Sequence, residues 1–146
     1  FICADALDIP ELFKSESFSL AVCNPPYFER GRNVCCETGA KQLARHESTA
    51  GLEDFFRVCA YALKKGGRLC MIHRPERLAD LMCLSRAAGL EAKRLRLVTP
   101  HSGEIPRQVL MEFIKGAGRG LKVCPELSVR DKEGNYTKEI NDIYCR

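Results

Sequence analysis

The chain has 146 residues, of which 45% are hydrophobic and 29% are charged, a composition ordinary for one soluble globular domain. The formal net charge of +4 permits an RNA partner without requiring one. No apolar stretch approaches the roughly 20 residues that span a bilayer, which argues against a membrane protein.

Short elements are expected in the first third of the chain. Residues 1–3 are predicted to end a strand, residues 9–14 to form a helical turn, and residues 18–23 to form a fully buried strand. The polar segment at residues 28–48 could be a lid or substrate loop with a helical stretch at residues 40–46, or equally a surface loop.

Two helices flank a strand in the middle of the chain. The apolar spacing predicts an amphipathic helix over residues 52–64 that Gly66 terminates. Residues 68–73 are predicted to form a strand, and residues 76–88 a second helix closed by Gly89.

The last third is expected to be mainly β-structure. Residues 94–99 and 109–114 are predicted to form antiparallel strands joined by a loop at residues 100–106. A hairpin is expected over residues 127–136, around the turn at residues 131–134. The alternation of strands and helices before it indicates an α/β fold with a mostly parallel sheet.

Two loops are expected to converge on one crevice of this sheet. Ligands of open α/β sheets bind beyond the carboxyl ends of the strands. Asn24 follows the strand at residues 18–23, and His73 and Arg74 follow Ile72 at the end of the next strand.

The tetrad Asn24-Pro25-Pro26-Tyr27 is the most informative motif. The prolines make it a stiff, extended segment with carbonyl groups in fixed directions. The Asn24 side-chain oxygen and the Pro25 carbonyl could accept hydrogen bonds from a planar amine as its nitrogen becomes tetrahedral and positive. Tyr27 offers a flat face for stacking. The motif therefore predicts methylation of an adenine amine or a glutamine amide, with an ordinary turn as the alternative.

Other stretches accompany the tetrad and carry a family resemblance. They are Asp5 after an apolar stub, Gly66-Gly67, Arg74-Pro75-Glu76-Arg77-Leu78, Gly120-Leu121-Lys122-Val123, Tyr136-Thr137-Lys138-Glu139 and Ile143-Tyr144. With the tetrad they resemble the class I S-adenosylmethionine-dependent N6-adenine methyltransferases. More narrowly, the chain resembles the bacterial family that methylates the adenine 3′ of the anticodon in valine tRNA.

The resemblance implies a Rossmann-like class I methyltransferase fold, with residues 1–146 forming one domain. The chain would supply strands three to seven of a seven-stranded, mostly parallel sheet that ends in an antiparallel pair. In that fold the first two strands lie between the third and the fourth, so an unpaired edge is expected on residues 18–23. We therefore expect the C-terminal portion of a longer enzyme, lacking the glycine-rich cofactor loop and needing the N-terminal half as partner. A shorter but complete fold is the alternative.

The resemblance also implies S-adenosylmethionine as cofactor and tRNA as substrate, and hence a cytoplasmic enzyme. The expected site residues are Asp5, Ala6 and Asn24 for the cofactor, Asn24, Pro25, Pro26 and Tyr27 for catalysis, and Tyr27, Phe28 and Arg74 for the substrate. Asp5 could instead only cap the following turn. Cations close in sequence to Arg74 could neutralise tRNA phosphates, although each alone is more often a solvated charge: Lys64, Lys65, Arg68 and Arg77.

Nine cysteines are present, none of them in a Cys-x-x-Cys spacing, and the odd total favours a reducing cytoplasm. Those inside apolar runs are expected to be small buried side chains: Cys23, Cys59, Cys70 and Cys83. The pair Cys35 and Cys36 lies in a polar loop and could bind zinc or oxidise, but further ligands at a suitable spacing are missing, so no metal site is expected.

Two functions of other classes share these features. A protein glutamine methyltransferase would use the same tetrad, because an amide nitrogen poses the same chemical problem. A non-catalytic RNA-binding remnant would keep the fold without the cofactor loop.

Overall fold

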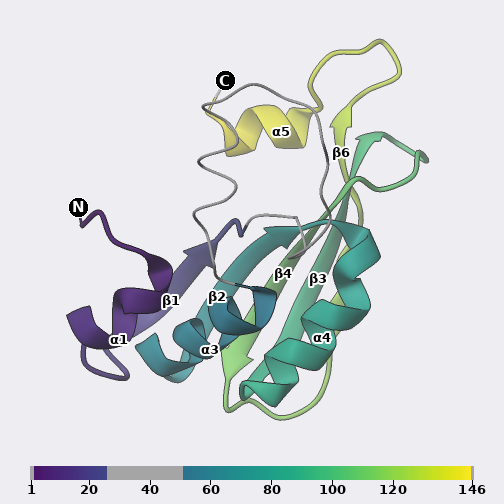
Figure 1. Ribbon diagram of the computed structural model, residues 1–146. Helices are drawn as coiled ribbons and strands as arrows, with labels where there is room; N and C mark the ends of the chain where they lie inside the picture. The colour runs from purple at the N-terminus through teal and green to yellow at the C-terminus, as the bar shows by residue number, and fades with distance from the viewer. Residues whose placement is uncertain (1, 26–50, 146) are drawn as a thin grey trace, which may run out of the picture.

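The computed structural model describes residues 2–25 and 51–145, which build a mixed sheet with its two longest helices on one face (Figure 1). The elements in chain order are η1 (Ala6–Asp8), α1 (Ile9–Leu12), β1 (Phe18–Cys23), α3 (Leu52–Ala62), β2 (Leu63–His73), η2 (Pro75–Arg77), α4 (Leu78–Ala87), β3 (Leu90–His101), β4 (Gln108–Lys115), β5 (Lys122–Val123), β6 (Leu127–Arg130) and α5 (Lys138–Ile143). No helix within these ranges is long and apolar enough to cross a bilayer.

The strand order is β1-β2-β4-β3-β5, and β6 also pairs with β3. β1 and β2 are parallel, β4 is antiparallel to both β2 and β3, and β5 and β6 are parallel to β3. Because β4 runs against its two neighbours, β1, β2, β3 and β6 all end at the same edge of the sheet. We call this edge the carboxyl edge.

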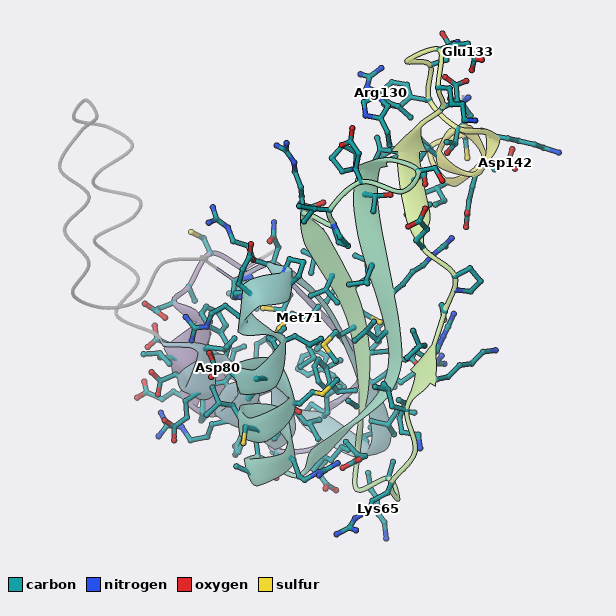
Figure 2. All side chains as sticks on the ribbon, turned by 90° about the vertical axis from the view of Figure 1, so that its right-hand side faces the viewer. Lys65, Met71, Asp80, Arg130, Glu133 and Asp142 are labelled. Atoms are coloured by element: carbon teal, nitrogen blue, oxygen red, sulfur yellow. The ribbon has the colours of Figure 1, made fainter. Side chains whose placement is uncertain are left out.

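The main core lies between the sheet and the helices α3 and α4. Leu69 is paired with Phe113, and Met71 with Met111, so alternate residues of β2 and β4 face the helices together. The ring of Phe56 from α3 meets that of Phe113 edge-on, with centroids 5.3 Å apart. Figure 2 shows Met71 between α4 and the sheet. This packing fixes the direction in which β2 reaches the carboxyl edge.

The second face of the sheet is only partly covered. Ile140 of α5 packs there with Val98 and Leu127, at the β3 end of the sheet. At the β1 end, the side chains of Leu20 and Val22 are 53% and 78% exposed. The predicted strand at residues 18–23 is confirmed, but the expectation that it is fully buried is wrong, because its outward-facing residues have no layer over them among the described residues.

The junction between α3 and β2 differs from the sequence-based expectation. The helix ends at Ala62, not at residue 64, and Gly66 terminates no helix because the chain continues directly as a strand. Leu63 is fully buried in the core, which favours turning into the sheet at this point. In the pairing of β1 with β2, Phe18 lies opposite Leu63 but Leu20 lies opposite Arg68. Residues 64–67 of β2 therefore form a bulge.

Several other predicted elements are confirmed with shifted ends. The helix at residues 76–88 is η2 followed by α4, and Gly89 ends it with a positive φ of 79°. The antiparallel pair at residues 94–99 and 109–114 is β3 with β4. The expected strand at residues 1–3 is wrong where it can be judged, because Ile2 and Cys3 are exposed and outside any strand.

The C-terminal segment was only partly predicted. The turn at residues 131–134 exists and is closed by the Asp131 carboxylate, which accepts hydrogen bonds from the backbone amides of Glu133 and Asn135. The strand before it, β6, pairs mainly with β3, and only an isolated bridge joins Arg130 to Tyr136. The short helix α5, capped by the Thr137 side chain, was missed.

Candidate active site

Asn24 and Pro25 lie at the carboxyl edge, directly after β1. The parallel register pairs Cys23 with Met71, so continuing it brings Asn24 to the level of Ile72. Asn24 is exposed and Pro25 is buried. A cavity of about 400 Å³ lies along the partly covered second face, and Asn24 belongs to its lining. The tetrad thus begins where a rigid strand ends, with its first side chain accessible to a ligand.

His73 and Arg74 lie beside this position, at the end of β2. The His73 side chain is 2% exposed, and its Nδ1 accepts a hydrogen bond of 2.8 Å from the Arg74 backbone amide. Burial is the largest influence on the His73 imidazole and lowers its pKa, with Arg77 and Arg74 adding to this effect. The Arg74 hydrogen bond and Asp80 oppose the shift without reversing it. His73 is therefore neutral at pH 7, and sequence reasoning had given it no role.

The cysteines near the site are protonated thiols. Burial raises the pKa of Cys23 to about 11 and that of Cys59 to about 12. Cys23, Cys59 and Cys70 are half-buried, but the expectation of a buried Cys83 is wrong, because that side chain points outward from α4. Within the described part of the chain, no group of three or more His, Cys, Asp or Glu side chains is placed so that it could hold a metal ion. Cys35 and Cys36 lie outside the described residues.

Asp5 and Ala6 stand at the start of η1. One carboxylate oxygen of Asp5 accepts a hydrogen bond of 2.9 Å from the Leu7 amide, which is the capping role weighed in the sequence. Asp5 is nevertheless exposed, so its carboxylate can accept a further donor. Capping and ligand binding are thus compatible at this position.

Three predicted site residues, Pro26, Tyr27 and Phe28, lie outside the described residues, as do the segment at residues 28–48 and the helix expected within it. Arg74 lies at the carboxyl edge, as expected.

The cations grouped by sequence do not form one surface. Lys64, Lys65 and Arg68 are at the start of β2, at the end of the sheet opposite Arg74. Figure 2 shows Lys65 at one extreme of the molecule and Arg130 at the other. Arg77 donates a hydrogen bond of 2.6 Å to Asp80 in the first turn of α4. These cations are close in sequence, but the extended strand β2 separates the group at its start from the arginines that follow its end.

A larger pocket of about 1130 Å³ opens at the carboxyl edge beside the β3–β4 connection. Arg74 is the one sequence-predicted site residue in its lining, while Arg107 and Arg130 were missed. No local sequence pattern indicates that Arg107 and Arg130 line one pocket, because β3 and β6 are brought together only by the tertiary fold.

The fold is a partial Rossmann-like class I methyltransferase fold. A predicted O-methyltransferase, protein Atu636 from Agrobacterium tumefaciens, superposes with a TM-score of 0.71 at 22% identity, covering 97% of this chain and 57% of that one. A protein from Thermus thermophilus assigned as a DNA modification methylase, solved with S-adenosyl-L-methionine, gives a TM-score of 0.55 at 18% identity. The match covers 94% of this chain and 56% of that one.

Within that class, the chain is similar to proteins named tRNA1(Val) (adenine(37)-N6)-methyltransferase, as its motifs had indicated. The relative from Cronobacter sakazakii is 29% identical over 135 residues, which are 90% of this chain and 51% of that protein. The relative from Porphyromonas gingivalis is 31% identical over 111 residues, which are 75% of this chain and 43% of that protein. The chain spans about half the length of the curated relatives it matches. No family model matches it.

Proposed function

We propose that this chain carries the acceptor site of an S-adenosylmethionine-dependent methyltransferase that modifies the N6 amine of an adenine in tRNA, beside the anticodon of valine tRNA. The observation that carries the proposal is the position of Asn24 and Pro25, which begin the tetrad at the carboxyl edge of a methyltransferase fold. The names of the relatives support the choice of tRNA adenine over a protein glutamine. A tRNA substrate would place the enzyme in the cytoplasm.

The proposed chemistry assigns a part to each described residue of the site. When bound, S-adenosylmethionine supplies an electrophilic methyl group on a positively charged sulfur. The Asn24 side-chain oxygen and the Pro25 carbonyl accept hydrogen bonds from the two amine hydrogens, and so stabilise the nitrogen as it gains a bond and positive charge. The surplus proton then passes to water, because methylation has made it acidic. No strong base is needed, in accord with a neutral, buried His73 that holds the loop by accepting from Arg74.

The described residues fit part of a cofactor site. The exposed Asp5 carboxylate can accept a hydrogen bond from the cofactor's adenine amine, with Ala6 beside it, and Asn24 would lie near the methyl group. Among the described residues, β1 pairs only with β2, and Leu20 and Val22 stand exposed on it. We therefore propose that the methyl-donor site is completed by chain equivalent to the other, amino-terminal half of the relatives.

Transfer of an isotope-labelled methyl group from S-adenosylmethionine tests the proposed function, with tRNA and a glutamine-containing protein offered as acceptors. The 146-residue chain is assayed alone and mixed with the amino-terminal half of the Cronobacter relative. We expect label in tRNA, and Asn24→Ala should lower the rate about a hundredfold, the cost of losing one hydrogen-bonding group that stabilises transition-state charge.

Arg57→Gln is the matched control, because Arg57 is an exposed residue of α3 that pairs only with Asp54 within the described residues. It should label tRNA at the wild-type rate. Label in the protein acceptor instead of tRNA would replace the proposal with glutamine methylation. An Asn24→Ala protein that labels tRNA as fast as wild type would refute the role given to the tetrad.

A further inference from the structure

The pocket of about 1130 Å³ at the carboxyl edge is formed by segments that are distant in sequence. One wall is the turn between β3 and β4, and the others are η2 and the ends of β3 and β6. In Figure 1 this turn and the end of β6 lie together at the upper right of the molecule. The pocket therefore lies at the same edge of the sheet as Asn24, and β2 and β4 lie between β1 and the strands β3 and β6 that border it.

Three arginines from three segments line this pocket: Arg74 after β2, Arg107 before β4 and Arg130 at the end of β6. The Arg107 backbone amide donates a hydrogen bond of 3.0 Å to the Val98 carbonyl, which fixes the backbone of Arg107 against β3. The Arg130 guanidinium lies 4.5 Å from the centre of the Tyr136 ring and donates to the Gly134 carbonyl. Because its guanidinium is already held, Arg130 loses less side-chain entropy when it binds an anion.

Two carboxylates share the pocket and leave it with an excess of positive charge. Glu76 and Glu104 line it with the three arginines. Glu104 Oε1 lies 3.3 Å from Nδ1 of His101, within the β3–β4 turn itself. This mixture of three arginines and two carboxylates favours a ligand whose negative charges are separated along its length. Such a ligand can place its charges beside the arginines and away from the carboxylates.

An exposed apolar side chain stands beside these charges. Ile105, at the β3–β4 turn, is 86% exposed and lines the pocket next to Pro106. Arginines next to an isolated apolar side chain suit a nucleotide chain, in which phosphates alternate with riboses and bases that have apolar faces.

We propose that this pocket binds the sugar-phosphate backbone of the RNA strand adjacent to the modified adenosine. Arg107 and Arg130 contact phosphates and Ile105 contacts a ribose or base, while Asn24 holds the target amine at the other end of the same edge. This inference rests on the proposed function, because it takes RNA as the substrate. It adds a second contact region that no tetrad residue forms.

The salt dependence of binding to a synthetic hairpin RNA tests the proposal. Each phosphate contact contributes about 0.7 to 0.9 to the slope of log K against log salt. Losing one contact should therefore weaken binding about five- to eightfold at 0.1 M salt and flatten the slope by nearly one. We expect this loss for Arg107→Gln and for Arg130→Gln. Arg130→Lys should keep most of the slope, because it keeps the charge.

Arg119→Gln is the matched control. Arg119 follows β4, at the end of the sheet opposite the pocket, and the substitution removes the same charge. It should leave affinity and slope at wild-type values, and thermal unfolding checks that every variant is folded.

Wild-type affinity and slope in both pocket variants would overturn the inference and leave the proposed function standing. A wild-type protein that binds no RNA would also overturn the inference, and the methyl-transfer assay with the amino-terminal half present would then decide the proposed function separately. Tighter binding of polyglutamate than of the RNA at the same ionic strength, lost in Arg107→Gln and Arg130→Gln, would also overturn the inference, because the pocket would then be a site for acidic peptides.

Discussion

His73 should make the protein less stable as the pH falls, because the unfolded chain takes up a proton on this side chain at a higher pH than the folded chain does. Its pKa is lowered in the folded state, mainly by burial, from an ordinary value near 6.5. Well above pH 6.5 the imidazole is neutral in both the folded and the unfolded state. As the pH falls through this value, the unfolded chain binds more of this proton than the folded chain, so the free energy of unfolding falls with decreasing pH until the folded imidazole is also protonated. One such group contributes at most about 1.4 kcal/mol per pH unit.

His73→Asn isolates this effect. The asparagine oxygen can accept the Arg74 amide as Nδ1 does, and the side chain does not titrate. The smaller side chain leaves a cavity that lowers stability equally at every pH. His73→Leu differs in removing the acceptor, and leaving the Arg74 amide unpaired should cost about 1–3 kcal/mol at every pH.

Urea unfolding of wild type and both variants between pH 7.5 and 5 gives the measurement. The stability difference between wild type and His73→Asn should be constant above pH 7 and shrink or reverse below pH 6.5, because only wild type loses stability through this group. A difference that stays flat to pH 5 would refute the account of His73 as a buried neutral side chain.

Two further predictions concern the frame of the site. A Cβ at Gly67 would lie 2.8 Å from the Lys64 carbonyl oxygen, a backbone atom, so Gly67→Ala should destabilise the protein by about 1–3 kcal/mol in urea unfolding. Gly118→Ala adds a methyl group in open space and should be neutral, so equal stability of the two variants would contradict the geometry of the β2 bulge. Arg96 holds α5 through two hydrogen bonds to Glu139, at 2.6 and 2.7 Å, and binds the Pro125 carbonyl at 2.8 Å. Arg96→Gln should speed amide hydrogen exchange in α5 about tenfold and leave α4 unchanged, whereas unchanged exchange in α5 would contradict this anchoring role.

The sequence was most informative where local chemistry decides the structure. The stretch from Phe18 to Cys23 is apolar and β-prone, and Pro25 prevents its continuation, so the strand and its end just before Asn24 follow from the residues alone. Gly89 similarly marks the end of α4 through a backbone angle that other residues rarely adopt.

The sequence was least informative where tertiary packing decides. The family resemblance had indicated an unpaired edge at residues 18–23, and β1 does lie at the edge of the described sheet. The apolar run alone could not reveal that Leu20 and Val22 are exposed, because its sequence is the same whether the strand is covered or not. The helical pattern of α3 runs on into Leu63, yet this side chain is buried by turning into β2. The pocket arginines Arg107 and Arg130 are 23 positions apart and line the same pocket only because β6 pairs with β3, so no local sequence pattern could have indicated this.

The central claim is that the carboxyl edge at Asn24 holds an adenine amine for methylation, and identification of the modified nucleoside tests it most directly. Transfer RNA is incubated with S-adenosylmethionine and the protein, with the amino-terminal half of the Cronobacter relative present, then digested and analysed by mass spectrometry. We predict N6-methyladenosine with wild type and about a hundredfold less with Asn24→Ala. A methyl group found on another nucleoside, or N6-methyladenosine formed equally well by Asn24→Ala, would contradict the claim.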